Sequence, residues 1–273
     1  MTGMPRITVN GVALQYTDRG GEGPPLLLVH GWGGDGAEWE PHLRAWAGRR
    51  RVLVPDLRGH GRSAVPHEGY GPRDFAADLA ALLGALGTGP VVAVGHSMGG
   101  QVVTALAVEH PELVRALVVA DPAYGADEAE LAGLPAEQRA LRAEGAPWAV
   151  RFVGGAFRPG AHAALRARHE TLMGAMDPGV LLRCRDGMYL APDAFGPRPA
   201  CRAYLAGRRC PVLAVYSRPA PAAWERGTVA PAGSRVEVWP ECGHYLHEEE
   251  PDRLVALVDS WTAGLESPAD PAR

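Results

Sequence analysis

Lysine is absent from the sequence, and arginine supplies all 27 permanently basic side chains. Without lysine, the chain cannot form a Schiff base, hold pyridoxal phosphate through a lysine, or use the lysine of a phosphate-binding loop. The formal net charge of −4 leaves no basic surplus for contacts with nucleic acid or an anionic membrane. We therefore expect a small-molecule substrate, and neither a nucleic-acid nor a membrane partner.

Cysteine and long apolar runs are also scarce. The four cysteines show no C-x-x-C spacing, which favours reduced structural thiols over a disulfide framework. No apolar run approaches the roughly 18 residues that a membrane span needs, and the first residues lack the apolar core of a secretory signal. These features predict a soluble, cytoplasmic protein that uses no cofactor and no metal. Whether it forms a homodimer stays open.

Short apolar runs alternate with amphipathic helical patterns along most of the chain. The runs are apolar throughout, as is typical of strands that are covered on both faces. Strands that alternate with helices predict an α/β fold with a mostly parallel central sheet flanked by helices. An Asn10-Gly11 pair near the start predicts a tight β-hairpin. The later runs are residues 26–31, 51–56, 91–96, 115–121, 211–216 and 235–240.

The regular alternation stops at the strand that ends at Asp121. From residue 125 to residue 205 the patterns are helical only, and glycine and proline interrupt them often. We expect a core α/β domain made of residues 1–124 and 206–273, with residues 125–205 forming a helical cap over the carboxyl edge of the sheet. If side chains of the cap line the site, the substrate is apolar and of small to medium size. The candidates for this substrate-binding role are Trp148, Phe152, Met173 and Tyr189.

Residues 95–99, GHSMG, form a G-x-S-x-G motif between a predicted strand and a predicted helix. In this context Ser97 occupies a sharp strand-to-helix turn, where small residues two positions to either side relieve steric crowding. The hydroxyl then points toward the helix N-terminus, where the helix dipole favours developing negative charge. A plain glycine turn that carries a surface serine is the alternative interpretation.

A second glycine-rich loop, HGWGG, follows the strand that ends near His30. Its glycines allow backbone N–H groups to face the edge of the sheet. We expect the N–H groups of Trp32 and Met98 to form an oxyanion hole for a tetrahedral intermediate. His30 itself is expected to be structural.

The order of these motifs resembles the α/β-hydrolase superfamily, and in particular its lid-bearing serine esterases and lactonases. The segments that carry the resemblance are HGWGG, DLRGHGRS, GHSMGG, the helical insertion and GHYLHEEEP, so that it covers nearly the whole chain. The resemblance implies the α/β-hydrolase fold and Ser97 as the nucleophile. It also implies a general-base histidine in the loop after the last strand, here His244.

The choice of histidine can also be argued from the residues. The base must reach the serine from the carboxyl edge of the sheet and comes late in the chain. Of the ten histidines, His244 and His247 satisfy both conditions. We favour His244, because it follows Gly243 and lies closer to the strand end.

The acid that should orient this base is not where the resemblance places it most often. In much of the superfamily it follows the strand that corresponds to residues 211–216, but Ala220 occupies the expected position and Glu225 is the only carboxylate nearby. Some members carry the acid one strand earlier, and here that strand ends at Asp121. We expect Asp121 to be the acid, with Glu225 as the alternative. Other acids such as Asp127, or a dyad without an acid, complete the alternatives.

With a serine nucleophile, the expected reaction is hydrolysis of an ester, thioester or lactone through an acyl-enzyme. The resembling dehalogenases carry aspartate where this chain has Ser97, which disfavours dehalogenation and, for the same reason, epoxide opening. One alternative is a non-hydrolytic enzyme on the same scaffold, such as a perhydrolase, C–C lyase, acyltransferase or biosynthetic cyclase. Another is a ligand-binding pseudo-enzyme.

Overall fold

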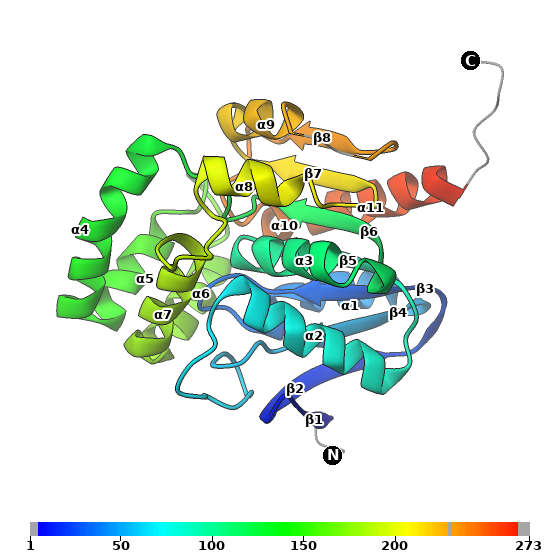
Figure 1. Cartoon of the computed structure of the whole chain (residues 1–273), viewed down its shortest axis with the longest axis horizontal. Coiled ribbons are helices and arrows are strands. Elements are labelled where there is room, and N and C mark those ends of the chain that lie inside the picture. The colour runs from blue at the N-terminus through cyan, green and yellow to red at the C-terminus, as the bar shows by residue number, and fades with distance from the viewer. Residues whose placement is uncertain (1–4, 229–230, 267–273) are drawn as a thin grey trace.

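A mostly parallel sheet of eight strands forms the centre of the molecule (Figure 1). Its strands are β1 (Arg6–Val9), β2 (Val12–Arg19), β3 (Gly21–Val29), β4 (Gly48–Pro55), β5 (Val91–His96), β6 (Val114–Ala120), β7 (Val212–Tyr216) and β8 (Arg235–Val238). The computed structural model describes residues 5–228 and 231–266. The strand order is β1-β2-β4-β3-β5-β6-β7-β8. Strand β2 runs antiparallel to both of its neighbours, and the six strands from β3 to β8 are parallel to one another, which confirms the predicted α/β class.

The sheet begins with the predicted hairpin. Asn10 and Gly11 both have positive φ, at 48° and 76°, as a two-residue type I′ turn requires. Val9 and Val12 pair across the turn and close the antiparallel ladder of β1 and β2. The Asn-Gly prediction is therefore confirmed.

Helices cover both faces of the sheet. Helices α2 and α3 lie on one face, and α1 and α11 lie on the other (Figure 1). No helix in the described ranges is both long enough and apolar enough to cross a membrane. The bounds of these and the shorter helices of the core are η1 (Gly36–Trp39), α1 (Glu40–Trp46), α2 (Pro72–Leu86), α3 (Met98–Glu109), η2 (Pro111–Leu113), α9 (Pro219–Arg226), α10 (Leu246–Glu249) and α11 (Pro251–Glu266).

The central strands are buried on both sides, as their continuous apolar sequence predicts. In β3, Leu27 and Val29 pack into the apolar layer that includes α2 and α3. Their neighbours Leu26 and Leu28 point the opposite way, into the layer that includes α1 and α11. Because successive side chains of a strand alternate between faces, a strand covered by helices on both sides must be apolar at every position.

The chain between β6 and β7 forms helices only, which we call the inserted helices. They are α4 (Glu128–Glu144), α5 (Ala146–Gly154), α6 (Ala163–Ala175), α7 (Pro178–Tyr189) and α8 (Arg198–Leu205). Helices α4 to α7 stand beyond the carboxyl ends of the parallel strands (Figure 1). The carboxyl edge of a parallel sheet is where α/β folds build their sites, so the inserted helices lie where they can enclose one.

Candidate active site

Ser97 occupies a strained turn between β5 and α3. Its φ of 51° is positive, which is rare for a residue with a side chain. A Cβ atom added to Gly95 would lie 2.2 Å from the carbonyl oxygen of Gly99, and one added to Gly99 would lie 2.3 Å from that of Val29. Both contacts are impossibly short, so this turn needs glycine on each side of the serine. The local geometry is that of a nucleophile elbow and not of an ordinary surface turn.

The loop after β3 passes directly beside this serine. A Cβ atom added to Gly31 would lie 3.4 Å from the Cβ of Ser97. Trp32 follows Gly31, and its indole Nε1 donates a hydrogen bond to the carbonyl oxygen of Leu181 in α7, at 3.0 Å. Met98 is the first residue of α3, so its N–H belongs to the positive end of the helix dipole. The two predicted oxyanion donors thus belong to the segments that flank Ser97.

Asp121 and His244 form a partly buried hydrogen-bonded pair. The imidazole Nδ1 of His244 lies 2.8 Å from Oδ2 of Asp121. Ser217 adds two donors to the same carboxylate, its N–H to Oδ1 at 3.0 Å and its hydroxyl to Oδ2 at 2.8 Å. Burial on its own raises the pKa of Asp121, but the hydrogen bonds from His244 and Ser217 outweigh it and hold the pKa below its usual value. The carboxylate is therefore ionised and keeps Nδ1 of His244 protonated.

The two candidate histidines have different environments. His244 has about a third of its side chain exposed and lines a cavity together with Ser97 and Asp121. His247 is fully buried and faces Glu38 instead. Of the two candidates, His244 is therefore the one whose ring lies at the cavity, with Asp121 bound to its Nδ1.

The alternative acids are engaged elsewhere. Glu225 is buried in α9, where it accepts hydrogen bonds from Arg208 at 2.8 Å and from the Tyr216 hydroxyl at 3.0 Å. Asp127 caps the N-terminus of α4. Ala220 lies in the first turn of α9. The structure brings neither Glu225 nor Asp127 to the imidazole of His244.

The cavity above Ser97 has a volume of about 310 Å³. Of the four cap residues predicted to bind substrate, Phe152 and Tyr189 line it. Trp148 stacks on Phe152, with ring centroids 5.1 Å apart, and supports the wall without being part of the lining. Met173 packs instead against Gly33 of the loop after β3.

Sequence reasoning missed Ser217 and Arg185. Ser217 follows β7, one residue beyond the strand, and no motif distinguished it from other loop serines. Arg185 lines the cavity from α7 with its side chain 6% exposed, and it pairs with Glu137 of α4. Its guanidinium carbon lies 5.2 Å from the ring centroid of Phe152 and 5.5 Å from that of Trp32. The helical sequence pattern around Arg185 does not distinguish it from an arginine at the surface.

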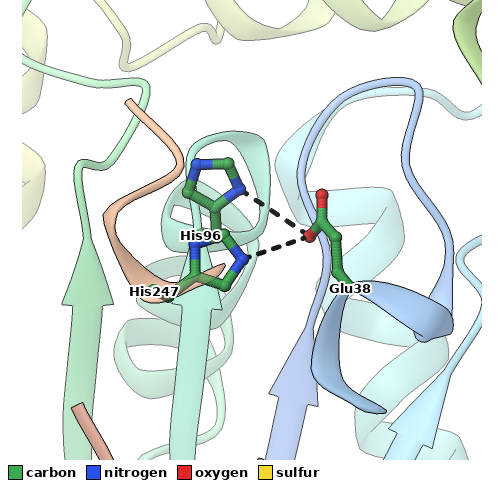
Figure 2. Close-up of side chains that lie close together, drawn as sticks. All are labelled: Glu38, His96 and His247. Carbon is green, nitrogen blue, oxygen red and sulfur yellow. Dashed lines mark ion pairs between the residues drawn. The ribbon is translucent and has the colours of Figure 1, made fainter. Parts of the chain in front are cut away.

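Two overlapping groups of buried side chains offer metal-ligand chemistry near the site. One is Glu38 with His96 and His247, and the other is Glu38 with His169 and Glu248. In the first group the carboxylate of Glu38 faces both rings (Figure 2). Burial raises the pKa of Glu38, but its interactions with His247 and His96 outweigh burial and hold that pKa well below its usual range. Each residue of a group offers one ligand atom, and the three atoms of a group lie within 4.8 Å of one another.

Comparisons with known proteins identify similar hydrolases. Over nearly its full length the chain is similar to 2-hydroxymuconate semialdehyde hydrolase of a Pseudomonas species, with 29% identity over 273 residues that cover 91% of this chain and 90% of that protein. It is 34% identical over 116 residues to 2-(acetamidomethylene)succinate hydrolase of Mesorhizobium japonicum, a match that covers 42% of this chain and 41% of that protein. The chain thus spans about two fifths of the length of some curated relatives that it matches.

The fold has close counterparts among solved structures. A thermophilic esterase from Thermogutta terrifontis superposes with a TM-score of 0.80 at 25% identity, covering 97% of this chain and 98% of that one. The family model described as the alpha/beta hydrolase family matches residues 26–257. That range contains the Ser97 elbow, the inserted helices and the His244 loop, so both the predicted fold and the predicted superfamily are confirmed. This chain is a member of the alpha/beta hydrolase family.

Proposed function

We propose that the protein is a serine hydrolase that cleaves an ester, thioester or lactone through an acyl-enzyme. Ser97 is the nucleophile, His244 the general base and Asp121 the acid that orients it. The N–H groups of Trp32 and Met98 form the oxyanion hole. The observation that carries the proposal is the 2.8 Å contact between His244 and Asp121 at the cavity that Ser97 also lines.

The chemistry follows from this arrangement. With Nδ1 bound to Asp121, Nε2 of His244 takes the proton of the Ser97 hydroxyl as the oxygen attacks the substrate carbonyl carbon. The oxyanion receives hydrogen bonds from the two N–H groups, and His244 returns the proton to the leaving alcohol, thiol or lactone oxygen. Water then attacks the acyl-enzyme by the same route and regenerates Ser97.

The proposed substrate is small to medium in size and mostly apolar. The cavity of about 310 Å³ falls at the lower end of ligand pockets. Trp32, Phe152 and Met188 contribute apolar surface to its wall, and Arg185 and Tyr189 add polar groups. We further propose that the inserted helices, residues 125–205, act as a cap, since α4, α5 and α7 supply much of this wall.

Related proteins support hydrolysis and suggest a second candidate substrate. The esterase from Thermogutta terrifontis supports ester cleavage at this fold. The likeness to 2-hydroxymuconate semialdehyde hydrolase extends over 91% of this chain, which favours a test of that semialdehyde beside the esters. Both candidates predict a hydrolase that depends on Ser97.

A substrate panel on matched serine variants tests the proposal. The panel contains p-nitrophenyl esters of increasing acyl length, simple lactones and 2-hydroxymuconate semialdehyde. We expect Ser97→Ala to lower kcat on every accepted substrate by at least about four orders of magnitude. Ser260→Ala, which changes an exposed serine of α11, should leave kcat unchanged. Turnover that persists in Ser97→Ala would contradict the proposed nucleophile.

A further inference from the structure

Glu38, His96 and His247 form a buried group beside the active site, which we call the Glu38 cluster (Figure 2). Glu38 comes from η1, His96 is the last residue of β5, and His247 belongs to α10. Each of the three is at most 1% exposed. The proposed mechanism uses none of these side chains. They contact the two loops that carry Trp32 and His244, however.

Glu38 holds the loop that carries an oxyanion donor. The backbone N–H of Gly31 donates to its carboxylate, 3.0 Å from Oε2 and 3.4 Å from Oε1. Gly31 directly precedes Trp32, whose N–H is one of the two proposed donors. The loop lies outside any helix or strand, so a side-chain acceptor takes the place that a ladder hydrogen bond would have. A shift of Glu38 would therefore move the Trp32 N–H.

His96 connects the same cluster to the catalytic histidine. Its Nε2 lies 3.0 Å from the carbonyl oxygen of His244. A carbonyl oxygen can only accept, so Nε2 of His96 carries the ring proton and donates. The other ring nitrogen, Nδ1, is then an acceptor in the neutral ring, and it faces Oε2 of Glu38 at 3.7 Å. His247 lies on the same side of that oxygen as His96, with its Nε2 at 3.8 Å and its ring centroid 4.2 Å from that of His96.

We propose that Glu38 is a positioning residue that holds the oxyanion loop and the His244 loop in register with Ser97. It acts on the first loop through the N–H of Gly31. It acts on the second through packing, because its Oε2 faces Nδ1 of His96 at 3.7 Å and limits the movement of the ring whose Nε2 donates to the carbonyl oxygen of His244. This inference rests on the proposed function of Ser97 and His244, and it adds a side chain that touches neither the substrate nor the reacting atoms.

Two substitutions at Glu38 separate the loss of the side chain from the loss of its charge. Glu38→Ala removes the acceptor of the Gly31 N–H and the carboxylate that packs against His96, and we expect kcat to fall about 10- to 100-fold. Glu38→Gln should restore kcat to within about threefold of the wild type, because the amide oxygen can accept from Gly31 and the side chain keeps nearly the same size. KM should change little in both variants. The matched control is Glu40→Ala, which removes an exposed carboxylate two residues away.

The kcat values of the two variants decide whether Glu38 acts by positioning the loops or through its charge. Loss in Glu38→Ala with rescue in Glu38→Gln supports positioning. An unchanged kcat in Glu38→Ala, or a Glu38→Gln enzyme as slow as the alanine variant, would overturn it. These values come from a p-nitrophenyl ester that the wild type hydrolyses.

A second measurement needs no activity and no unstable variant. Long-range ¹H–¹⁵N correlation spectra of the imidazole rings report which nitrogen of each histidine is protonated. We expect His96 of the wild-type chain to be neutral with its proton on Nε2, and the same tautomer in Glu38→Gln. A proton on Nδ1 of His96 would overturn the inference even if the alanine variant cannot be purified. If the wild type hydrolyses no substrate while His96 shows the expected tautomer, the proposed function fails and the contact between His96 and His244 stands.

Discussion

Ser217, the residue that follows β7, donates both its N–H and its hydroxyl to Asp121, the residue that follows β6. The end of β7 is where the resemblance to the superfamily places the acid most often, and in this chain it carries a serine and then α9. The proposed acid follows the neighbouring strand, and Ser217 at the end of β7 supplies hydrogen-bond donors to it. Asp121 thereby reaches His244 with its charge stabilised by a fixed set of partners.

Asp121→Asn should lower kcat by about two to four orders of magnitude. The amide would no longer favour the proton on Nδ1 of His244, and it could not stabilise the imidazolium that forms during attack. Ester hydrolysis by the purified variant measures the effect, with circular dichroism as a check on folding. A fall of less than about threefold would show that Asp121 does not orient the base.

Glu225→Gln is the matched control for that experiment, and it should affect stability instead. Glu225 and Arg208 form a buried ion pair at 2.8 Å, and the substitution removes the negative charge that faces the buried guanidinium. We expect the free energy of unfolding in urea to fall by about 3 to 5 kcal/mol, while kcat of the folded enzyme stays near the wild-type value. A crippled but stable Glu225→Gln enzyme would reverse the assignment of the acid.

The glycines that flank Ser97 should be irreplaceable. Gly99→Ala would place a Cβ 2.3 Å from the backbone oxygen of Val29. The turn would have to open, and this would displace Ser97 from its position at the cavity. We expect loss of activity, or of soluble protein, from this single methyl group. Gly84→Ala in α2 meets nothing within 4 Å and should stabilise the chain by up to about 1 kcal/mol. Thermal unfolding and ester hydrolysis of the pair give both readouts.

Stability should fall as the solution becomes more acidic than about pH 6.5. Burial lowers the pKa of His42 to about 4 and is also the main cause that lowers the pKa of His60 to about 3. Between these values and about 6.5 the unfolded chain binds protons that the folded chain does not, so the free energy of unfolding decreases as pH falls, by about 1.4 kcal/mol per pH unit for each histidine.

Urea unfolding across about pH 5 to pH 7 checks this dependence. His42→Gln should remove one histidine's share of the slope, because a glutamine does not titrate. A wild-type stability that is flat or that rises toward acid pH would contradict the prediction.

The parts of the site that were predictable from the sequence depend on local rules. The turn around Ser97 follows from glycine spacing between a strand and a helix, and the Asn10-Gly11 hairpin follows from turn chemistry. His244 could be narrowed down because parallel strands bring their carboxyl ends to one edge. The same rule predicts Asp121 as the acid, because Ala220 occupies the position where the superfamily carries the acid most often.

The remaining features depend on contacts between distant segments, which sequence patterns do not encode. Glu38 and His247 are 209 positions apart and meet only because η1 and α10 pack on either side of β5. Arg185 appears on an ordinary amphipathic helix, and its burial results from its pairing with Glu137 across α4 and α7. Trp148 and Met173 had the right chemistry for a substrate wall, but their helices turn them toward other side chains.

The most direct test of the central claim is to identify the residue that a fluorophosphonate modifies. An activated serine reacts with such a probe, and an unactivated one labels poorly. Intact mass followed by peptide mapping should show one adduct per chain, on Ser97, with labelling much slower in Asp121→Asn and unchanged in Glu225→Gln. An adduct on another residue, or a wild-type chain that does not react, would contradict the account.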